Sequence, residues 1–193
     1  MQQRHFTAFA IILILWTWSV RGQGNGCLSL EGSKACPAYS RYYVPLIGIG
    51  DRYPFLANVI DLASFDQALY NYVQSSEYYM DRLGCHSEQR VPYARYSLTR
   101  LCTMVIHDVS YASPHCNADH AVAPVPPLCQ RTCQAWVSSI GQLTNNRCFN
   151  GLVSGGSVMD YEFMKQCMVL PRYNSTADNC ISGQENEPDN CGT

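Results

Sequence analysis

The stretch PPLCQRTCQAW, residues 126–136, and the cysteines that follow it decide the fold of this chain. Cys129 and Cys133 are four residues apart, so they share one face of a helix. Each of them can therefore pair with a different cysteine further along the chain. The segment continues through Cys167 and ends at Cys180. This pattern predicts a short helix that is tied to the whole C-terminal half.

The helix around these two cysteines is predicted to begin near Pro127 and to run to about Thr144. Proline suits a first helical turn because its missing N–H would have no partner there. Apolar residues recur at helical spacing on the side of the two cysteines. This face, which we expect to pack against the core, carries Cys129, Cys133, Trp136, Val137, Ile140 and Leu143.

Two segments upstream also have helical periodicity. The first is predicted over Ser64–Leu83, because residues 64–67 match a capping box and Gly84 stands just past the end. The second is predicted over Ser97–Val109 and turns Cys102 toward the core. In the first helix the predicted core face carries Phe65, Leu69, Tyr72, Ser76, Tyr79, Met80 and Leu83, and the polar face carries Asp66, Gln67, Gln74, Glu77 and Asp81 together with Tyr70 and Tyr78. The two tyrosines suit a contact surface if they are exposed, and the alternative is that a loop covers them.

The remaining segments have weaker patterns. Residues 23–62 are rich in Tyr, Pro and Gly, which predicts irregular chain with one or two short strands. Tyr161–Met168 is a candidate short helix, and the chain from Pro171 onward is expected to be extended. Residues 184–193 are acidic and polar, which favours a mobile tail after a domain of residues 23–183.

Residues 1–22 have the features of a secretory signal peptide. Arg4 and His5 precede an apolar run from Phe9 to Trp18, and small residues lead to a predicted cut before Gln23. The run is short for a membrane span, so a signal anchor is the weaker alternative. We therefore expect a secreted, extracellular product, and the sequon Asn174-Ser175-Thr176 predicts a surface glycosylation site.

Composition excludes some classes of function. Removal of the signal peptide takes away two of the 13 basic residues and none of the 15 acidic ones, so the mature charge is 11 − 15 = −4. No basic cluster remains, which argues against nucleic-acid binding. The 11 cysteines indicate a disulfide framework in an exported chain. Their odd number leaves one over, and Cys191 is the natural candidate for a free thiol or a disulfide-linked partner.

The order of the cysteines resembles the cysteine-rich domain of Frizzled receptors. The specific features are Pro126-Pro127 before a C-x3-C helix, a proline soon after Cys167, and twelve residues between Cys167 and Cys180. Cys27 and Cys36, with eight residues between them, resemble the opening pair of that family. The resemblance implies a mainly α, disulfide-rich fold with a short irregular or β N-terminal segment.

The resemblance also implies the pairing of ten cysteines. Spacing alone leaves very many connectivities open. The gaps after Cys85, Cys102 and Cys133 are longer than is usual in Frizzled domains, and loops tolerate such growth at low cost. The implied disulfides are Cys27–Cys116, Cys36–Cys102, Cys85–Cys148, Cys129–Cys180 and Cys133–Cys167, with Cys191 left without a counterpart.

Catalytic and metal chemistry have little support in the sequence. His107-Asp108 with Tyr111 resembles the active-site helix of secreted phospholipases, but no Gly- and Cys-rich calcium loop precedes it. His107 lies opposite the apolar stripe of its helix, which predicts a solvated side chain. His115 and His120 do not complete a regular zinc-ligand spacing with it. We therefore expect no enzyme activity, no cofactor and no metal.

The remaining candidate site is apolar. In Frizzled-type domains a groove beside the helix that leads into the third cysteine receives a fatty acyl chain. The matching positions are Tyr78, Tyr79, Met80 and Leu83, and Ile181 completes the edge. A lining of Met and aromatic residues suits an adaptable apolar ligand. The alternative is that Tyr79, Met80 and Leu83 simply belong to the core stripe.

These observations lead to two hypotheses on function. The first is a secreted, non-enzymatic, Frizzled-like binding module that recognises a lipid or a lipidated extracellular protein. The alternative is an extracellular protein-interaction subunit that docks on a membrane-protein ectodomain, such as a channel, through Tyr70, Tyr78 and the longer loops. The wider superfamily of the Frizzled domain also includes folate-receptor-like and sterol-transport N-terminal domains, and similar cysteine-rich modules occur in extracellular auxiliary subunits of ion channels.

Overall fold

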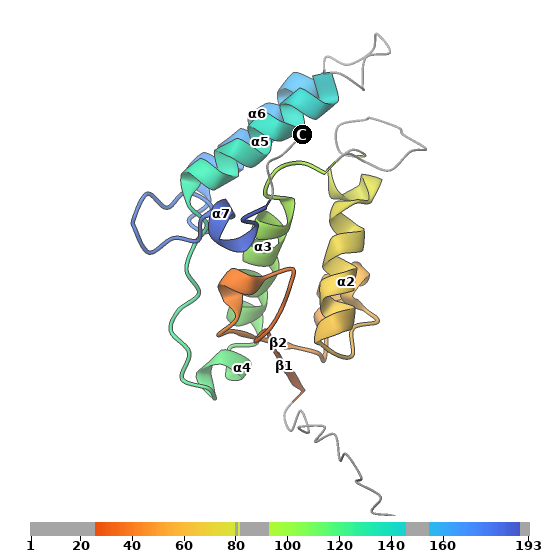
Figure 1. The fold of residues 1–193 in the computed structure, drawn as a ribbon, viewed down its shortest axis with the longest axis vertical. Coiled ribbons are helices and arrows are strands. Elements are labelled where there is room, and N and C mark those ends of the chain that lie inside the picture. The colour runs from red at the N-terminus through yellow and green to blue at the C-terminus, as the bar shows by residue number, and fades with distance from the viewer. Residues whose placement is uncertain (1–25, 80, 82–92, 146–154, 190–193) are drawn as a thin grey trace, which may run out of the picture.

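The computed structural model describes residues 26–79, 81, 93–145 and 155–189. The described part is mainly helical and disulfide-rich, with one small two-stranded sheet. Helix α3 lies at the centre of the molecule, with α2 on one side and the pair α5 and α6 beyond its N-terminal end (Figure 1). The predicted signal peptide, residues 1–22, lies outside the described residues. The elements, in chain order, are β1 (Cys27–Ser29), η1 (Pro37–Tyr39), β2 (Tyr43–Pro45), α1 (Ile49–Arg52), η2 (Pro54–Leu56), α2 (Leu62–Val73), η3 (Ser76–Tyr78), α3 (Ser97–Ala112), α4 (His115–Ala118), α5 (Gln130–Asn145), α6 (Gly155–Val169) and α7 (Gly183–Asn186).

The N-terminal segment contains the two short strands that the sequence predicts. β1 and β2 pair antiparallel, with Leu28 opposite Val44. Both of these side chains are buried. Asn117 in α4 extends this small sheet, because its side-chain Oδ1 accepts a hydrogen bond from the backbone N of Tyr43 at 2.9 Å and its Nδ2 donates to the Tyr43 carbonyl at 3.1 Å. The sheet is thereby fixed to α4, and the same Nδ2 also donates to Ser110 Oγ in α3 at 2.9 Å.

Helix α2 differs from its prediction at both ends. Its N-cap is Asp61, whose side chain accepts a hydrogen bond from the backbone N of Ser64 at 2.8 Å, so the capping box begins three residues earlier than predicted. The helix ends at Val73 rather than Leu83. Asp66 was expected on the polar face but is buried, since its carboxylate accepts hydrogen bonds from Ser33 Oγ at 2.6 Å and the Lys34 backbone N at 2.7 Å.

The predictions for the other helices agree more closely with the structure. α3 covers the predicted Ser97–Val109 and continues to Ala112, and α5 covers most of the predicted Pro127–Thr144. α6 is about twice the length predicted for residues 161–168. α5 and α6 pack side by side (Figure 1). They are connected by the disulfide Cys133–Cys167.

The stretch before α5 is held by the C-terminal segment. The backbone N of Leu128 donates to the Arg172 carbonyl at 2.8 Å, and that of Gln130 donates to the Ser175 carbonyl at 2.8 Å. Cys129 N donates to the Ile181 carbonyl at 2.9 Å. Isolated parallel bridges therefore tie this stretch to residues far away in sequence, in addition to the disulfide Cys129–Cys180.

Four disulfides join the described residues, and they are the pairs that the resemblance implies. The fifth implied pair, Cys85–Cys148, and the odd cysteine Cys191 lie outside the described residues. Among the described residues, no helix is long and apolar enough to cross a membrane. The four disulfides are Cys27–Cys116, Cys36–Cys102, Cys129–Cys180 and Cys133–Cys167.

The prediction of a mobile polar tail over residues 184–193 does not hold at the start of that range, where residues 184–186 belong to helix α7. Helix α7 is capped by Ser182, whose Oγ accepts a hydrogen bond from the Glu185 backbone N at 3.1 Å. Asn186 in this helix is buried, donates to the Ala35 carbonyl at 3.0 Å and accepts from the Ala38 backbone N at 3.2 Å. The domain therefore extends beyond residue 183, because residues with polar side chains dock on the N-terminal segment.

Candidate functional site

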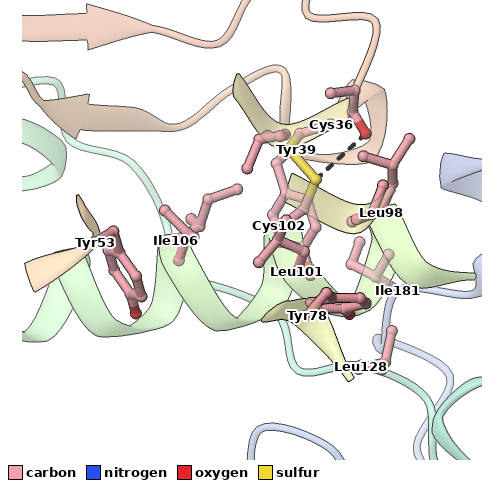
Figure 2. Packing of buried hydrophobic residues seen from close by; sticks show 14 of the residues in the cluster. Cys36, Tyr39, Tyr53, Tyr78, Leu98, Leu101, Cys102, Ile106, Leu128 and Ile181 are labelled. Carbon is pink, nitrogen blue, oxygen red and sulfur yellow. Dashed lines mark hydrogen bonds between the residues drawn. A yellow bond between two sulfur atoms is a disulfide. The ribbon is translucent and has the colours of Figure 1, made fainter. Parts of the chain in front are cut away.

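The structure places the predicted ligand-binding residues that it describes in the core. Tyr78 is 4% exposed, Tyr79 is fully buried and Ile181 is 6% exposed. Figure 2 shows Tyr78 and Ile181 among the packed residues of this core. Met80 and Leu83 lie outside the described residues. Tyr78, Tyr79 and Ile181 therefore belong to the packed interior. For Tyr79 this is the alternative stated above, in which the residue is simply part of the core face of its helix.

The early end of α2 explains this burial. After Val73 the side chain of Ser75 donates a hydrogen bond to the Tyr72 carbonyl at 2.7 Å, and the Ser75 backbone N donates to the same oxygen at 3.0 Å. This competition for the carbonyl ends the helix. The chain then turns through η3, so the adjacent side chains of Tyr78 and Tyr79 can both enter the core.

Tyr78 is the polar group at the centre of this region. Its hydroxyl donates to the Ser97 carbonyl at 3.0 Å. Its ring lies 6.1 Å from the rings of Tyr79 and Trp136. Burial raises the pKa of the Tyr78 hydroxyl well above its ordinary value. Periodicity places Tyr78 on the polar side of a longer helix, where a covering loop would bury it; it is buried instead because α2 ends at Val73 and the chain turns it into the core.

Tyr70 is also less exposed than its predicted role requires. Its side chain is half-buried, and its hydroxyl donates to the Lys34 carbonyl at 3.0 Å. Burial raises the pKa of this hydroxyl. Tyr70 therefore helps to join α2 to the N-terminal segment.

An open groove of about 440 Å³ runs along the outer side of α2. It lies between this helix, η2 and η3. The residues that line it were not predicted as a site, because Gln67 and Glu77 were assigned to the polar face of the helix, Tyr72 to its core face, and residues 23–62 to irregular chain. The lining residues are Phe55, Asn58, Val59, Ser64, Gln67, Ala68, Asn71, Tyr72, Ser75 and Glu77.

The apolar side of the groove is built from two stacked rings. Phe55 and Tyr72 stack with their centroids 3.9 Å apart and an interplanar angle of 6°. Tyr72 in turn meets the ring of Tyr78 edge-on at 5.5 Å. The ring of Tyr72 therefore separates the groove from Tyr78, one of the predicted residues.

The other side of the groove is polar. Gln67 Nε2 donates a hydrogen bond to Asn71 Oδ1 at 2.8 Å, which orders two exposed amides along one helical edge. Asn58 and Glu77 add further exposed polar groups. Such a lining offers apolar contact on one side and hydrogen-bond donors and acceptors on the other, which suits an amphipathic ligand.

The segment with His107 and Asp108 has a structural role in the described residues. His107 is half-buried rather than solvated, and its Nε2 lies 3.0 Å from the Pro126 carbonyl oxygen. Burial lowers the pKa of His107. Asp108 accepts a hydrogen bond from the Tyr53 hydroxyl at 2.6 Å and pairs with Arg172. These contacts connect α3 with the segments on both sides of it.

His115 and His120 make contacts that do not include His107. His120 stacks on Tyr43, with ring centroids 3.8 Å apart. His115 lies beside Cys27 and Cys116, and the side chains of these three residues are the one group with metal-ligand spacing in the described part of the chain. The two sulfur atoms are bonded to each other. They are therefore not available as thiolate ligands in the oxidised protein.

Comparison with known proteins gives no relative: no family model matches the chain, and no curated protein or solved structure matches it.

Proposed function

We propose that this chain is a secreted, non-enzymatic, Frizzled-like binding module that holds a lipid, or the lipid of a lipidated extracellular protein, in the groove along α2. The observation that carries the proposal is the two-sided lining of this groove. The stacked rings of Phe55 and Tyr72 form one side, and the amides of Gln67 and Asn71 form the other.

The place of the groove supports the proposal. It follows the helix that precedes Cys85, where the resemblance to Frizzled domains implies an acyl-binding groove. The four described disulfides also have the pairing that the resemblance implies. A framework of this kind is typical of proteins that fold in an oxidising compartment. The ligand would lie on the outer side of the helix, against Tyr72, rather than directly on Tyr78.

The size and chemistry of the groove define the ligand class. A volume of about 440 Å³ is within the range of small-molecule sites. An alkyl chain can lie against Phe55 and Ala68, which are half-buried, and remove their exposed apolar surface from water. A headgroup or peptide backbone can then hydrogen-bond to the exposed amides. Glu77 adds a negative charge, which disfavours a second anion at that end.

Native mass spectrometry of the full chain from a secreting host tests the proposal. We expect a fatty acid or sterol to co-purify with the wild type. Ala68→Trp should fill the groove and weaken binding at least about tenfold, which corresponds to about 1.4 kcal/mol. Ala63→Trp is the matched control, because Ala63 is exposed on the same helix and does not line the groove.

Two results would count against the lipid groove. One is repeated recovery of ligand-free wild-type protein together with no binding of added fatty acid or sterol. The other is unchanged lipid binding by Ala68→Trp when its circular dichroism spectrum and melting temperature match those of Ala63→Trp.

The exposed polar edge favours a second candidate, a protein-interaction subunit that docks on a membrane-protein ectodomain without lipid. Ile60, which precedes the N-cap of α2, is 74% exposed and would extend the contact surface beyond Val59. Chemical cross-linking in the native tissue followed by affinity capture distinguishes the two. A membrane protein captured by the wild type and lost with Ile60→Asp, with no lipid in the purified chain, would support this candidate over the first.

A further inference from the structure

The C-terminal end of α6 presents an apolar surface that no described element covers. Met168 is 54% exposed and Val169 is 61% exposed. Single exposed apolar residues are ordinary on protein surfaces. Here two are consecutive, and together they form what we call the α6 patch, defined as Met168 and Val169. The amides of Gln130 and Gln134 approach the Met168 sulfur at 3.8 and 3.6 Å, which gives the patch a polar border.

The sequon asparagine lies next to this patch. Asn174 Nδ2 donates a hydrogen bond to the Met168 backbone carbonyl at 3.2 Å. Asn174 is half-buried, and Thr176, the hydroxyl residue of the sequon, is exposed. The Ser175 carbonyl accepts a hydrogen bond from the Gln130 backbone N at 2.8 Å, so the position of the sequon relative to α5 is fixed.

We propose that Asn174 carries an N-linked glycan whose first sugars lie over the α6 patch. In the reaction, the side-chain nitrogen of Asn174 bonds to the anomeric carbon of an oligosaccharide carried on a diphospholipid. The bond from that carbon to the diphosphate breaks, the diphospholipid leaves, and the nitrogen loses one proton. The proposal requires entry into the secretory pathway but is independent of the ligand in the α2 groove.

The hydrogen bond to Met168 determines where the sugar goes. An asparagine side chain has two N–H groups, and glycosylation replaces only one of them. The remaining N–H can keep its bond to the Met168 carbonyl. The linkage therefore starts beside the patch, where the C–H face of a sugar ring can pack on Met168 and Val169 and reduce their contact with water.

The glycan leaves the α2 groove accessible. The segment with Asn174 and helix α2 lie on opposite sides of α3 in Figure 1. A glycan on Asn174 thus covers one apolar surface without blocking the other. This arrangement directs a ligand or partner to the groove rather than to the α6 patch.

Mass measurement and dye binding of the full chain from a eukaryotic secretory host test the proposal. Treatment with peptide N-glycosidase should reduce the mass of the wild type and leave N174Q and T176A unchanged. Peptide N-glycosidase is added after the protein has folded. Any change in surface exposure is therefore caused by loss of the glycan and not by a change in folding. Fluorescence of an apolar-surface dye should rise about twofold after treatment, as the patch becomes exposed.

A double variant and a matched control test whether the dye binds at the α6 patch. Met168→Gln with Val169→Thr should abolish the rise on deglycosylation. Ile47→Thr should retain it, because Ile47 is 82% exposed but lies in the N-terminal segment. Secreted protein without a glycan on Asn174, absence of a dye response, or an undiminished response in the double variant would each overturn the proposal.

Discussion

At the scale of single residues, Asp108 is a charged group that connects three parts of the described chain. It accepts from Tyr53 at 2.6 Å, lies 3.3 Å from an Arg52 nitrogen and pairs with Arg172. Burial alone would raise its pKa, but the Tyr53 hydrogen bond and the two guanidinium groups outweigh burial and lower the pKa of Asp108 below its ordinary value. The carboxylate therefore stabilises the fold in its charged form.

We predict that Asp108→Asn lowers stability at neutral pH by about 1 kcal/mol, because the exposed ion pair with Arg52 contributes little and that with Arg172 more. A carboxyl with a lowered pKa stabilises the fold fully above its unfolded pKa of about 3.9 and loses that contribution as the pH falls through the folded value. The difference between wild type and variant should therefore shrink in acid.

Thermal melting from pH 7 down to about pH 2 measures this difference. Asp119→Asn is the control, because Asp119 is exposed at the end of α4. A constant difference between wild type and Asp108→Asn over the whole range would contradict the assigned role of the carboxylate.

Another single residue shows what sequence reasoning could not find. Arg100 was not expected in the core, yet it is 6% exposed, with its guanidinium 4.0 Å from the Trp136 ring centroid and 4.9 Å from that of Tyr173. Its NH2 donates to Gln166 at 2.7 Å. Helical periodicity places a residue on a face but does not reveal that aromatic rings from two other segments will enclose a cation there.

At the scale of elements, α7 acts as a cap for a helix that is distant in sequence. The N-terminus of α3 has no side-chain cap of its own. Glu187, directly after α7, fills this role, because one carboxylate oxygen accepts from Thr99 N at 2.7 Å and Thr99 Oγ1 at 2.6 Å. The other accepts from the Tyr93 hydroxyl at 2.7 Å. A negative charge at this end also interacts favourably with the helix dipole.

We predict that Glu187→Ala destabilises the protein by about 3 kcal/mol, because three donors lose their acceptor in a buried place. For a chain of this size the melting temperature should fall by about 6–12 °C. Glu185→Ala is the control, since Glu185 is exposed and only its backbone N takes part in the cap of α7. Equal melting of the two variants would show that α7 contributes no such cap.

The elements also show where sequence patterns succeed. The spacing of apolar residues and cysteines was enough to predict α3 and α5, because each of these helices has a continuous apolar face. The same reasoning placed the end of α2 at Leu83, ten residues beyond its observed end at Val73. Periodicity continues there, but Ser75 takes the Tyr72 carbonyl and ends the helix. The groove was missed because its residues were divided among the polar face (Gln67, Glu77), the core face (Tyr72) and a segment predicted to be irregular.

At the scale of the whole molecule, the described disulfides fall into two groups. Cys27–Cys116 and Cys36–Cys102 tie the N-terminal segment to α3 and α4. Cys129–Cys180 and Cys133–Cys167 tie α5 to the C-terminal segment. Among the described residues, no disulfide connects the two groups, which meet through contacts such as those of Glu187 with Thr99 and of Arg100 with Trp136. A disulfide between the groups would restrict the unfolded chain further.

The pair implied by the resemblance, Cys85–Cys148, would supply that link. It would close a loop of 148 − 85 = 63 residues, which the chain-entropy model values at about 4 kcal/mol. Peptide mapping under non-reducing conditions should therefore find Cys85 linked to Cys148. Alkylation without reduction should label Cys191 unless it forms a disulfide with a partner.

Replacing both Cys85 and Cys148 by Ser should lower the denaturant midpoint but keep the other four pairs. If Cys191 is instead recovered bonded to Cys85 or Cys148, the two groups are not linked in this way, and the resemblance fails at that pair.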